Sequence, residues 1–301
     1  MGLRSLAIRA LDRGVLEFNR LRWEITRHFR GSVTVSTRQG VFTVLTGADE
    51  SIGRTLYCTG QYELDLMSKT MAFLRSIDKC PQSGGVIVDV GANNGVISVG
   101  MLYTREFARA IAIEPEPRNF ALLERNVDQN GLKDKVICLP YAASYQKGEI
   151  QLELSRTNSG DHRVRLKNAP LRSPQKYRES TRDVISVQAE RIDDILAAVP
   201  EEITRGIALA WVDVQGFEGH VFMGGERLFS SKIPVVAEIW PYGASRAGIG
   251  REQFSDIARR MWTDFWVLRG EVFDQYPIDA FDQFWDQLDR AGRFGHVIFA
   301  R

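Results

Sequence analysis

The sequence predicts an α/β protein with a mostly parallel sheet and helices on both of its faces. Short apolar runs alternate with helix-like segments from residue 86 onward, and repeated β-α units of this kind imply parallel strands joined by crossover helices. The first of these runs, Val86–Val88, has the β-branched composition of a strand that is buried on both faces. With 301 residues, of which 44% are hydrophobic, the chain can form one large domain with an extension.

Composition and charge argue against several classes of protein. The 39 basic and 38 acidic side chains give a net charge of +1, which does not indicate a nucleic acid partner. No apolar run approaches the roughly 18 residues of a membrane span, and the N-terminus lacks the apolar segment of a secretory signal. The cysteines Cys58, Cys80 and Cys138 show no metal-binding spacing and fit a reducing compartment. We therefore expect a cytoplasmic protein.

Residues 1–50 are predicted to form an extension that precedes a main domain over residues 51–301. Residues 1–30 have the pattern of an amphipathic helix, and they carry seven arginines against three acidic residues. The simpler interpretation is that this helix packs on the rest of the chain or on a second subunit, as in a homodimer. Peripheral contact with the inner face of a membrane is left open. Residues 32–46 alternate in polarity around Gly40, which predicts a short hairpin.

The order of elements follows from apolar periodicity and from turn residues. Residues 61–78 have helical periodicity and lead to a Pro- and Gly-containing turn before the first central strand. The polar segment 155–183, with eight basic and three acidic residues, is either a functional lid or an irregular loop. The first central strand is expected to start at Val86. The other expected strands span residues 110–113, 136–139, 149–154, 184–188, 207–214, 234–239, 265–268 and 296–300. Helices are expected after Gly95 and over residues 118–130, 192–198, 217–229, 253–262 and 281–291.

A glycine turn between the first central strand and its helix indicates a ligand site. It places a helix N-terminus and a row of free backbone N–H groups at the carboxyl end of a strand, where open α/β sheets bind ligands. The spacing of Gly91 and Gly95 is G-x-x-x-G, which differs from the G-x-G-x-x-G of diphosphate sites. A carboxylate at Asp89, two residues before the turn, would repel a diphosphate. S-adenosylmethionine fits better, because it carries an ammonium group and a ribose diol but no phosphate.

Acidic residues at the ends of three further strands complete the predicted site. Glu114 follows the second strand and can accept both hydrogen bonds of a ribose diol. Asp213 and Glu238 end two later strands, and Asp213 is placed to accept a proton from a substrate hydroxyl. His162 and His220 are alternative bases. Hard cations also bind such carboxylates, but we expect Glu218 and Glu238 to accept backbone N–H groups, and we predict no metal.

Five blocks in order resemble the FkbM-type family of class I S-adenosylmethionine-dependent methyltransferases: VDVGANNGVIS, AIEPEPRNFALLERNVDQNG, ERIDDIL, WVDVQGFEGHVFMGG and VVAEIWP. The resemblance implies a seven-stranded Rossmann-like sheet with an antiparallel last strand. It also implies that residues 60–63 close over the cofactor. Position 215 is Gln where the family commonly has an acid. Residues 1–50 and 155–183 match no family block, so they are expected to set substrate choice. The implied contacts are Asp89, Gly91, Asn93 and Gly95 to the methionine moiety, Glu114 to the ribose, Ala142 and Ala143 to the adenine, and Asn158 in a polar patch near the cofactor.

The sequence thus predicts a methyltransferase that uses S-adenosyl-L-methionine. The expected reaction is O-methylation of a hydroxyl on a sugar, glycolipid, polyketide or similar metabolite, with a small-molecule or glycoconjugate acceptor. Two alternatives remain at this point. One is a NAD-dependent oxidoreductase on a Rossmann-like fold. The other is a non-catalytic protein that binds a partner or a membrane.

Overall fold

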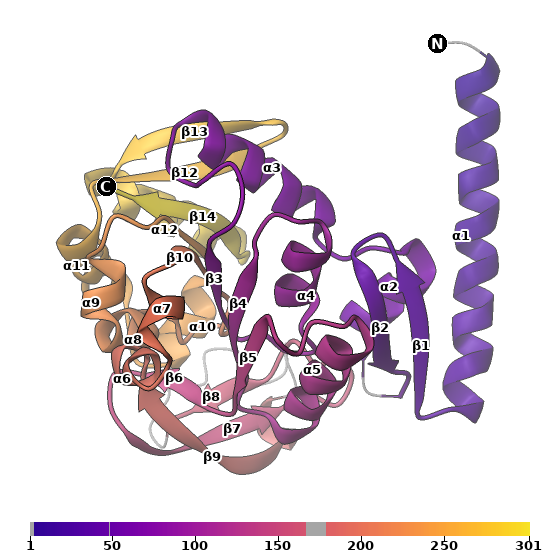
Figure 1. Ribbon diagram of the computed structural model, residues 1–301, viewed down its shortest axis with the longest axis horizontal. Coiled ribbons are helices and arrows are strands. Elements are labelled where there is room, and N and C mark those ends of the chain that lie inside the picture. The colour runs from indigo at the N-terminus through magenta and orange to yellow at the C-terminus, as the bar shows by residue number, and fades with distance from the viewer. Residues whose placement is uncertain (1–2, 48, 167–178) are drawn as a thin grey trace.

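A computed structural model describes residues 3–47, 49–166 and 179–301, with side chains from residue 14 onward. It has a central sheet with helices on both faces, a smaller second sheet, and an N-terminal helix and hairpin (Figure 1). The predicted α/β class is therefore confirmed. None of the helices in the described part is both long and apolar enough to cross a membrane.

The central sheet has eight strands in the order β13-β12-β14-β11-β10-β3-β4-β5, rather than the seven expected. Five strands run parallel, and β14 pairs antiparallel with both β11 and β12. The additional strand is β13, which forms a hairpin with β12 at the sheet edge and has few buried residues, so its sequence lacks an apolar run. The bounds are β3 Val86–Val90, β4 Arg109–Ile113, β5 Val136–Leu139, β10 Ile207–Val212, β11 Val235–Ile239, β12 Asp264–Arg269, β13 Val272–Pro277 and β14 Gly295–Ala300.

Two apolar cores cover the two faces of this sheet. One contains buried side chains of α3, α4 and α5, and the other contains those of α6, α8, α11 and α12. The helix expected over residues 217–229 is in fact two helices. The first ends at Gly224, which lies against the backbone of Ser144, and Gly225 separates it from the second. The bounds are α3 Leu64–Ser76, α4 Val96–Tyr103, α5 Pro117–Gln129, α6 Ile192–Ala197, α7 Glu201–Thr204, α8 Glu218–Gly224, α9 Glu226–Phe229, α10 Pro241–Arg246, α11 Arg251–Met261 and α12 Phe281–Ala291.

A second sheet of four strands, in the order β6-β9-β7-β8, lies beside the carboxyl ends of the central strands. It contains the strands predicted at 149–154 and 184–188. Part of the basic segment 155–183 also folds here, where the Arg163 guanidinium is buried against Glu179 at 2.6 Å. Residues 167–178 of that segment lie outside the described residues. The bounds are β6 Ala142–Ser144, β7 Gly148–Leu154, β8 Arg163–Arg165 and β9 Asp183–Arg191.

The N-terminal region contains a long helix, the predicted hairpin and a short helix that was not predicted. The hairpin is bonded to the main body, because the Thr43 backbone N–H donates to Asn126 of α5 at 2.8 Å. Phe42 and Val44 are buried in the same core as α3, α4 and α5. The long helix packs on the short one through Trp23. The bounds are α1 Leu3–Phe29, β1 Ser32–Thr37, β2 Gly40–Leu45 and α2 Ile52–Thr59.

Candidate functional site

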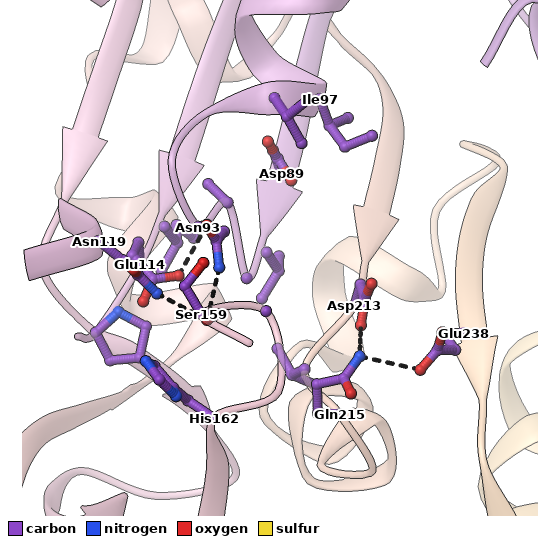
Figure 2. Close-up of a pocket in the computed structure, with 18 of the residues that line it drawn as sticks. Asp89, Asn93, Ile97, Glu114, Asn119, Ser159, His162, Asp213, Gln215 and Glu238 are labelled. Carbon is purple, nitrogen blue, oxygen red and sulfur yellow. Dashed lines mark hydrogen bonds between the residues drawn. The ribbon is translucent and has the colours of Figure 1, made fainter. Parts of the chain in front are cut away.

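A cavity of about 260 Å³ opens at the carboxyl ends of the parallel strands (Figure 2). The turn after β3 and the end of β4 form one half of its wall, together with the loop at residues 158–162. The ends of β10 and β11 form the other half. Of the predicted site residues, the cavity is lined by Asp89, Gly91, Asn93, Glu114, Ala142, Ala143, Asn158, Asp213 and Glu238. Gly95 is not among the lining residues.

The turn after β3 is held by its own hydrogen bonds. We expected a row of free backbone N–H groups here, and for residues 91–95 that expectation was wrong. Each N–H group of these five residues lies against an internal acceptor, so the turn itself offers no backbone donor to an anion. The N–H groups of Gly91 and Ala92 donate to Ile113 O at 2.9 and 3.0 Å, Asn93 to Glu114 Oε2 at 2.9 Å, Asn94 to Asn93 Oδ1 at 2.7 Å, and Gly95 to Ala92 O at 2.8 Å.

Gly91 and Gly95 of the turn are each required for a different structural reason. Gly91 has a φ of +88°, and a Cβ atom there would overlap with the carbonyl oxygen of Asp213. It therefore allows the end of β3 to touch the end of β10. Gly95 has a φ of +85° at the start of α4, and a Cβ atom there would lie 2.8 Å from a methyl carbon of Leu123. Gly95 thus fixes how α4 packs on α5.

Asp89 and Glu114 are buried carboxyl groups that face the cavity. Asp89 Oδ2 accepts hydrogen bonds from the backbone N–H and the hydroxyl of Ser98, at 3.0 and 2.5 Å. Glu114 accepts from the N–H groups of Asn93 and Glu116, each at 2.9 Å. Burial outweighs these hydrogen bonds and raises the pKa of each group to about 7. A cationic or donor-rich ligand would supply the missing compensation.

The loop at residues 158–162 closes this half of the cavity. Ser159 is the central residue, because its carbonyl oxygen accepts from the side-chain amides of Asn93 at 2.8 Å and Asn119 at 3.1 Å (Figure 2). His162 lies on this side of the cavity, away from Asp213 (Figure 2). Burial lowers the pKa of His162 to about 4, so the imidazole is neutral at pH 7.

The other half of the cavity has two carboxyl groups bridged by an amide. Gln215 Nε2 donates to Asp213 Oδ1 at 2.7 Å and to Glu238 Oε1 at 3.1 Å (Figure 2). Burial raises the pKa of both carboxyls, and the charge of Asp213 raises the pKa of Glu238 further. An acid at position 215 would add a third charge here. The Gln found at this position donates hydrogen bonds to its two neighbours instead.

Glu63 was not predicted as a site residue, but it lines the cavity. Burial and the charge of Asp213 raise the pKa of Glu63 to about 8. Its backbone adopts a φ of +52° just before α3. The match of residues 60–63 to a family segment that closes over the cofactor was the signal that could have identified it.

His296 was also missed. It pairs with Glu238 in the β11–β14 register, because the antiparallel β14 starts at the edge where the parallel strands end. Its Nε2 atom is buried and has no hydrogen-bond partner among the described residues. Burial lowers the pKa of His296, and the nearby charge of Asp213 opposes that shift. His296 is not among the residues that line the cavity, but a predicted final strand that starts at His296 and runs antiparallel was sufficient to place it beside Glu238.

Two other candidates have structural roles. Glu218 Oε1 accepts from the N–H groups of Val214 and Gly216, at 3.0 and 3.2 Å, as predicted for a turn acceptor. The ring of His220 is buried, and its Nε2 atom lies 2.6 Å from the carbonyl oxygen of Ala247. Within residues 3–47, 49–166 and 179–301, no group of three or more His, Cys, Asp or Glu side chains is arranged to hold a metal ion.

A protein-family match covers the part of the chain that contains this site. The model of the Methyltransferase FkbM domain matches residues 89–265, which is more than half of the chain. The chain belongs to the FkbM methyltransferase family. The matched residues run from Asp89 to β12 and include the ends of β3, β4, β10 and β11 that form the cavity.

Two curated relatives of this FkbM family member carry methyltransferase names. The 2-O-methyltransferase NoeI of Sinorhizobium fredii (strain NBRC 101917 / NGR234) is 31% identical over 146 residues, which cover 47% of this chain and 57% of NoeI. The methyltransferase sdnD of Sordaria araneosa is 27% identical over 178 residues, which cover 52% of this chain and 67% of sdnD. The chain thus spans little more than half the length of NoeI.

Solved structures align weakly with this FkbM family member. The methyltransferase FkbM from Methylobacillus flagellatus KT aligns with a TM-score of 0.39 and 14% identity, covering 72% of this chain and 43% of that chain. An alignment at this level adds nothing to the family assignment.

Proposed function

We propose that the protein transfers a methyl group from S-adenosyl-L-methionine to a hydroxyl of a small-molecule or glycoconjugate acceptor. The observation that carries this proposal is the acidic cavity, whose glycine turn has no free N–H group. Such a site suits a ligand that is cationic and rich in hydroxyl donors. Membership of the FkbM family and the methyltransferase names of two relatives support the same reaction.

The turn half of the cavity is assigned to the cofactor. Asp89 would accept from the ammonium group, and Glu114 would accept from the ribose diol through the lone pairs that its two backbone donors leave free. Gly91 and Asn93 would form the wall beside the methionine moiety. The adenine would lie against Ala142 and Ala143, near Asn158. When bound, the sulfonium supplies an electrophilic methyl group.

The β10–β11 half of the cavity is assigned to the acceptor. Asp213 would accept the proton of the acceptor hydroxyl as the acceptor oxygen bonds to the methyl carbon and the bond from that carbon to sulfur breaks. The nearer hydrogen bond from Gln215 favours the ionised form of Asp213. Burial and the charge of Asp213 raise the pKa of Glu238, so Glu238 would stay protonated and donate a hydrogen bond to a second oxygen of the acceptor. Much of the rate would come from positioning the two reactants.

The oxidoreductase alternative is disfavoured by the same cavity. A nicotinamide dinucleotide needs backbone N–H groups for its diphosphate. All five N–H groups of residues 91–95 are already used, and two buried carboxyls flank the turn. A non-catalytic role does not explain why the carboxyl groups of Asp89, Glu114, Asp213 and Glu238 are buried at the cavity, although burying them costs stability.

Calorimetric titration tests the proposal directly. We expect micromolar binding of S-adenosylmethionine to the purified chain, little binding of NADH, and loss of most affinity in Asp89→Asn. Absence of S-adenosylmethionine binding to the native chain would refute the assignment. Transfer of an isotopically labelled methyl group to a panel of sugars and other hydroxylated metabolites would then identify the acceptor class.

A further inference from the structure

From residue 14 onward, helix α1 has apolar residues on two faces that are roughly a third of a turn apart, and one of these faces is covered by the rest of the described chain. The covered face carries Leu16, Asn19 and Trp23, and it packs on α2, where Trp23 and Tyr57 have ring centroids 5.3 Å apart. Helix α1 lies at the edge of the molecule (Figure 1), and its second face is exposed. Five large apolar side chains on α1 are between 54% and 83% exposed, namely Val15, Phe18, Leu21, Ile25 and Phe29. An exposed apolar stripe of this size marks an interaction surface.

The spacing of this stripe is that of a coiled-coil seam. Residues 15, 18, 22, 25 and 29 repeat at alternating intervals of three and four, which are the a and d positions of a heptad. Leu21 flanks the seam. Four of the five seam positions are large and apolar. Arg22 is the exception, and its guanidinium lies 5.7 Å from the ring of Phe18.

The position of Arg22 indicates how a partner helix would pair. In a parallel pair of identical helices, Arg22 would face Arg22 of the second copy, and the like charges would repel. In an antiparallel pair centred near residue 20, each a position faces a d position. Arg22 would then face Phe18 of the second copy, which is a cation–π contact, and Val15 would face Ile25. We propose that a second copy of this chain binds to this face of α1 and forms an antiparallel helix pair.

A membrane surface is a poorer match for the same stripe. Membrane-surface helices carry Lys and Arg on the polar side of the apolar face. Here the row next to Leu21 carries Glu17, Glu24 and His28. The acids of that row are paired within the chain, Glu17 with Arg20 at 2.6 Å and Glu24 with Arg27 at 3.4 Å. Because the charges on this flank are paired, it presents no excess of positive charge to anionic lipid, which favours a protein partner.

Sedimentation equilibrium tests the proposal independently of catalysis. We expect the native chain to have twice its 34.0 kDa mass at concentrations of about 10–100 µM. Phe18→Glu and Ile25→Glu should each give a monomer. Val272→Glu is the matched control, because Val272 is an exposed apolar residue on β13, at 63% exposure, and should leave the dimer intact. Unchanged thermal unfolding and S-adenosylmethionine binding in the Glu variants would show that the fold is retained.

Three outcomes would overturn the proposal. One is a native chain that stays monomeric over this range. Another is dissociation by Val272→Glu to the same extent as by Phe18→Glu. The third is co-sedimentation with phosphatidylglycerol vesicles that Phe18→Glu abolishes, which would assign the stripe to a membrane. The antiparallel register has its own test, in which mixed Phe18→Cys and Arg22→Cys chains should form a disulfide with each other in preference to Phe18→Cys with itself.

Discussion

The two halves of the cavity differ in how completely their polar groups are satisfied. In the turn half, Asp89 and Glu114 each accept two hydrogen bonds, and every backbone N–H of residues 91–95 has an acceptor. In the β10–β11 half, one amide serves both Asp213 and Glu238. His296 Nε2 has no partner among the described residues.

This difference indicates a division of labour. A more completely bonded site is more rigid, which suits a cofactor that every turnover uses. A partly bonded site has free lone pairs and donors that a substrate can complete. We therefore interpret the turn half as the constant part of the enzyme and the β10–β11 half as the part that selects and deprotonates the acceptor.

The largest expected effect comes from a substitution at the contact between the ends of β3 and β10, where the two halves of the cavity meet. Gly91→Ala would force β3 away from Asp213, so we expect a loss of about 3–5 kcal/mol in the free energy of unfolding. Urea denaturation measures this loss. Gly270→Ala is the control, because Gly270 also has a positive φ, +64°, but has open space around it. It should cost only about 1 kcal/mol. Equal losses in the two variants would mean that the strand contact is unimportant.

The next largest effect separates chemistry from cofactor binding. Asp213→Asn removes the proposed proton acceptor and keeps its shape, so kcat should fall by about 10²–10⁴-fold. The Kd for S-adenosylmethionine should change much less than kcat, because Asp213 is assigned to the acceptor and its charge reaches the cofactor half only indirectly, through its effect on Asp89. Asp256→Asn, on the exposed side of α11, serves as a control. If the variant loses cofactor affinity and retains kcat, the two halves have been assigned in the wrong order.

A smaller effect concerns cofactor affinity and its pH dependence. Asp89→Asn should weaken S-adenosylmethionine binding by about 10–100-fold, from the loss of a charged hydrogen bond worth about 1.5–3 kcal/mol. Burial raises the pKa of Asp89 to about 7. Below that pH the group is protonated and cannot attract an ammonium, so affinity in the native chain should rise between pH 6 and pH 8. Calorimetry across this range should show a flatter profile for Asp89→Asn, and an identical slope would exclude Asp89 as the titrating group.

The smallest expected effect involves His296. Its positive form lowers the pKa of Asp213, so removing it should raise that pKa further. His296→Gln should therefore move the acid limb of the kcat–pH profile to higher pH. Because burial lowers the pKa of His296, the ring is mostly neutral at pH 7, so kcat at that pH should change little. A lower kcat with an unmoved acid limb would indicate that His296 acts only through packing.

The sequence predicted the turn half of the cavity better than the other half. Asp89, Gly91 and Glu114 follow directly from strand ends and turn spacing, because local residues build that half. Glu63 was missed because it reaches the cavity from a segment before the first central strand. His296 was missed because it lies beside Glu238 on the antiparallel last strand. The free N–H groups of residues 91–95 were predicted wrongly, because three of the five donate to Ile113 and Glu114 at the end of β4, a contact visible only in the folded chain.

The amide of Gln215 has a consequence for charge balance during a reaction cycle. Methyl transfer would convert a sulfonium into a neutral thioether, so the cavity would lose one positive charge while its carboxyls stay buried. The proton of the acceptor hydroxyl would replace that charge if it remains on Asp213, while Glu238 stays protonated throughout. Gln215 Nε2 donates to one oxygen of each group, and that oxygen can accept whether its group is ionised or protonated. The net charge of the cavity would then be the same before and after transfer, and neither carboxyl would have to move.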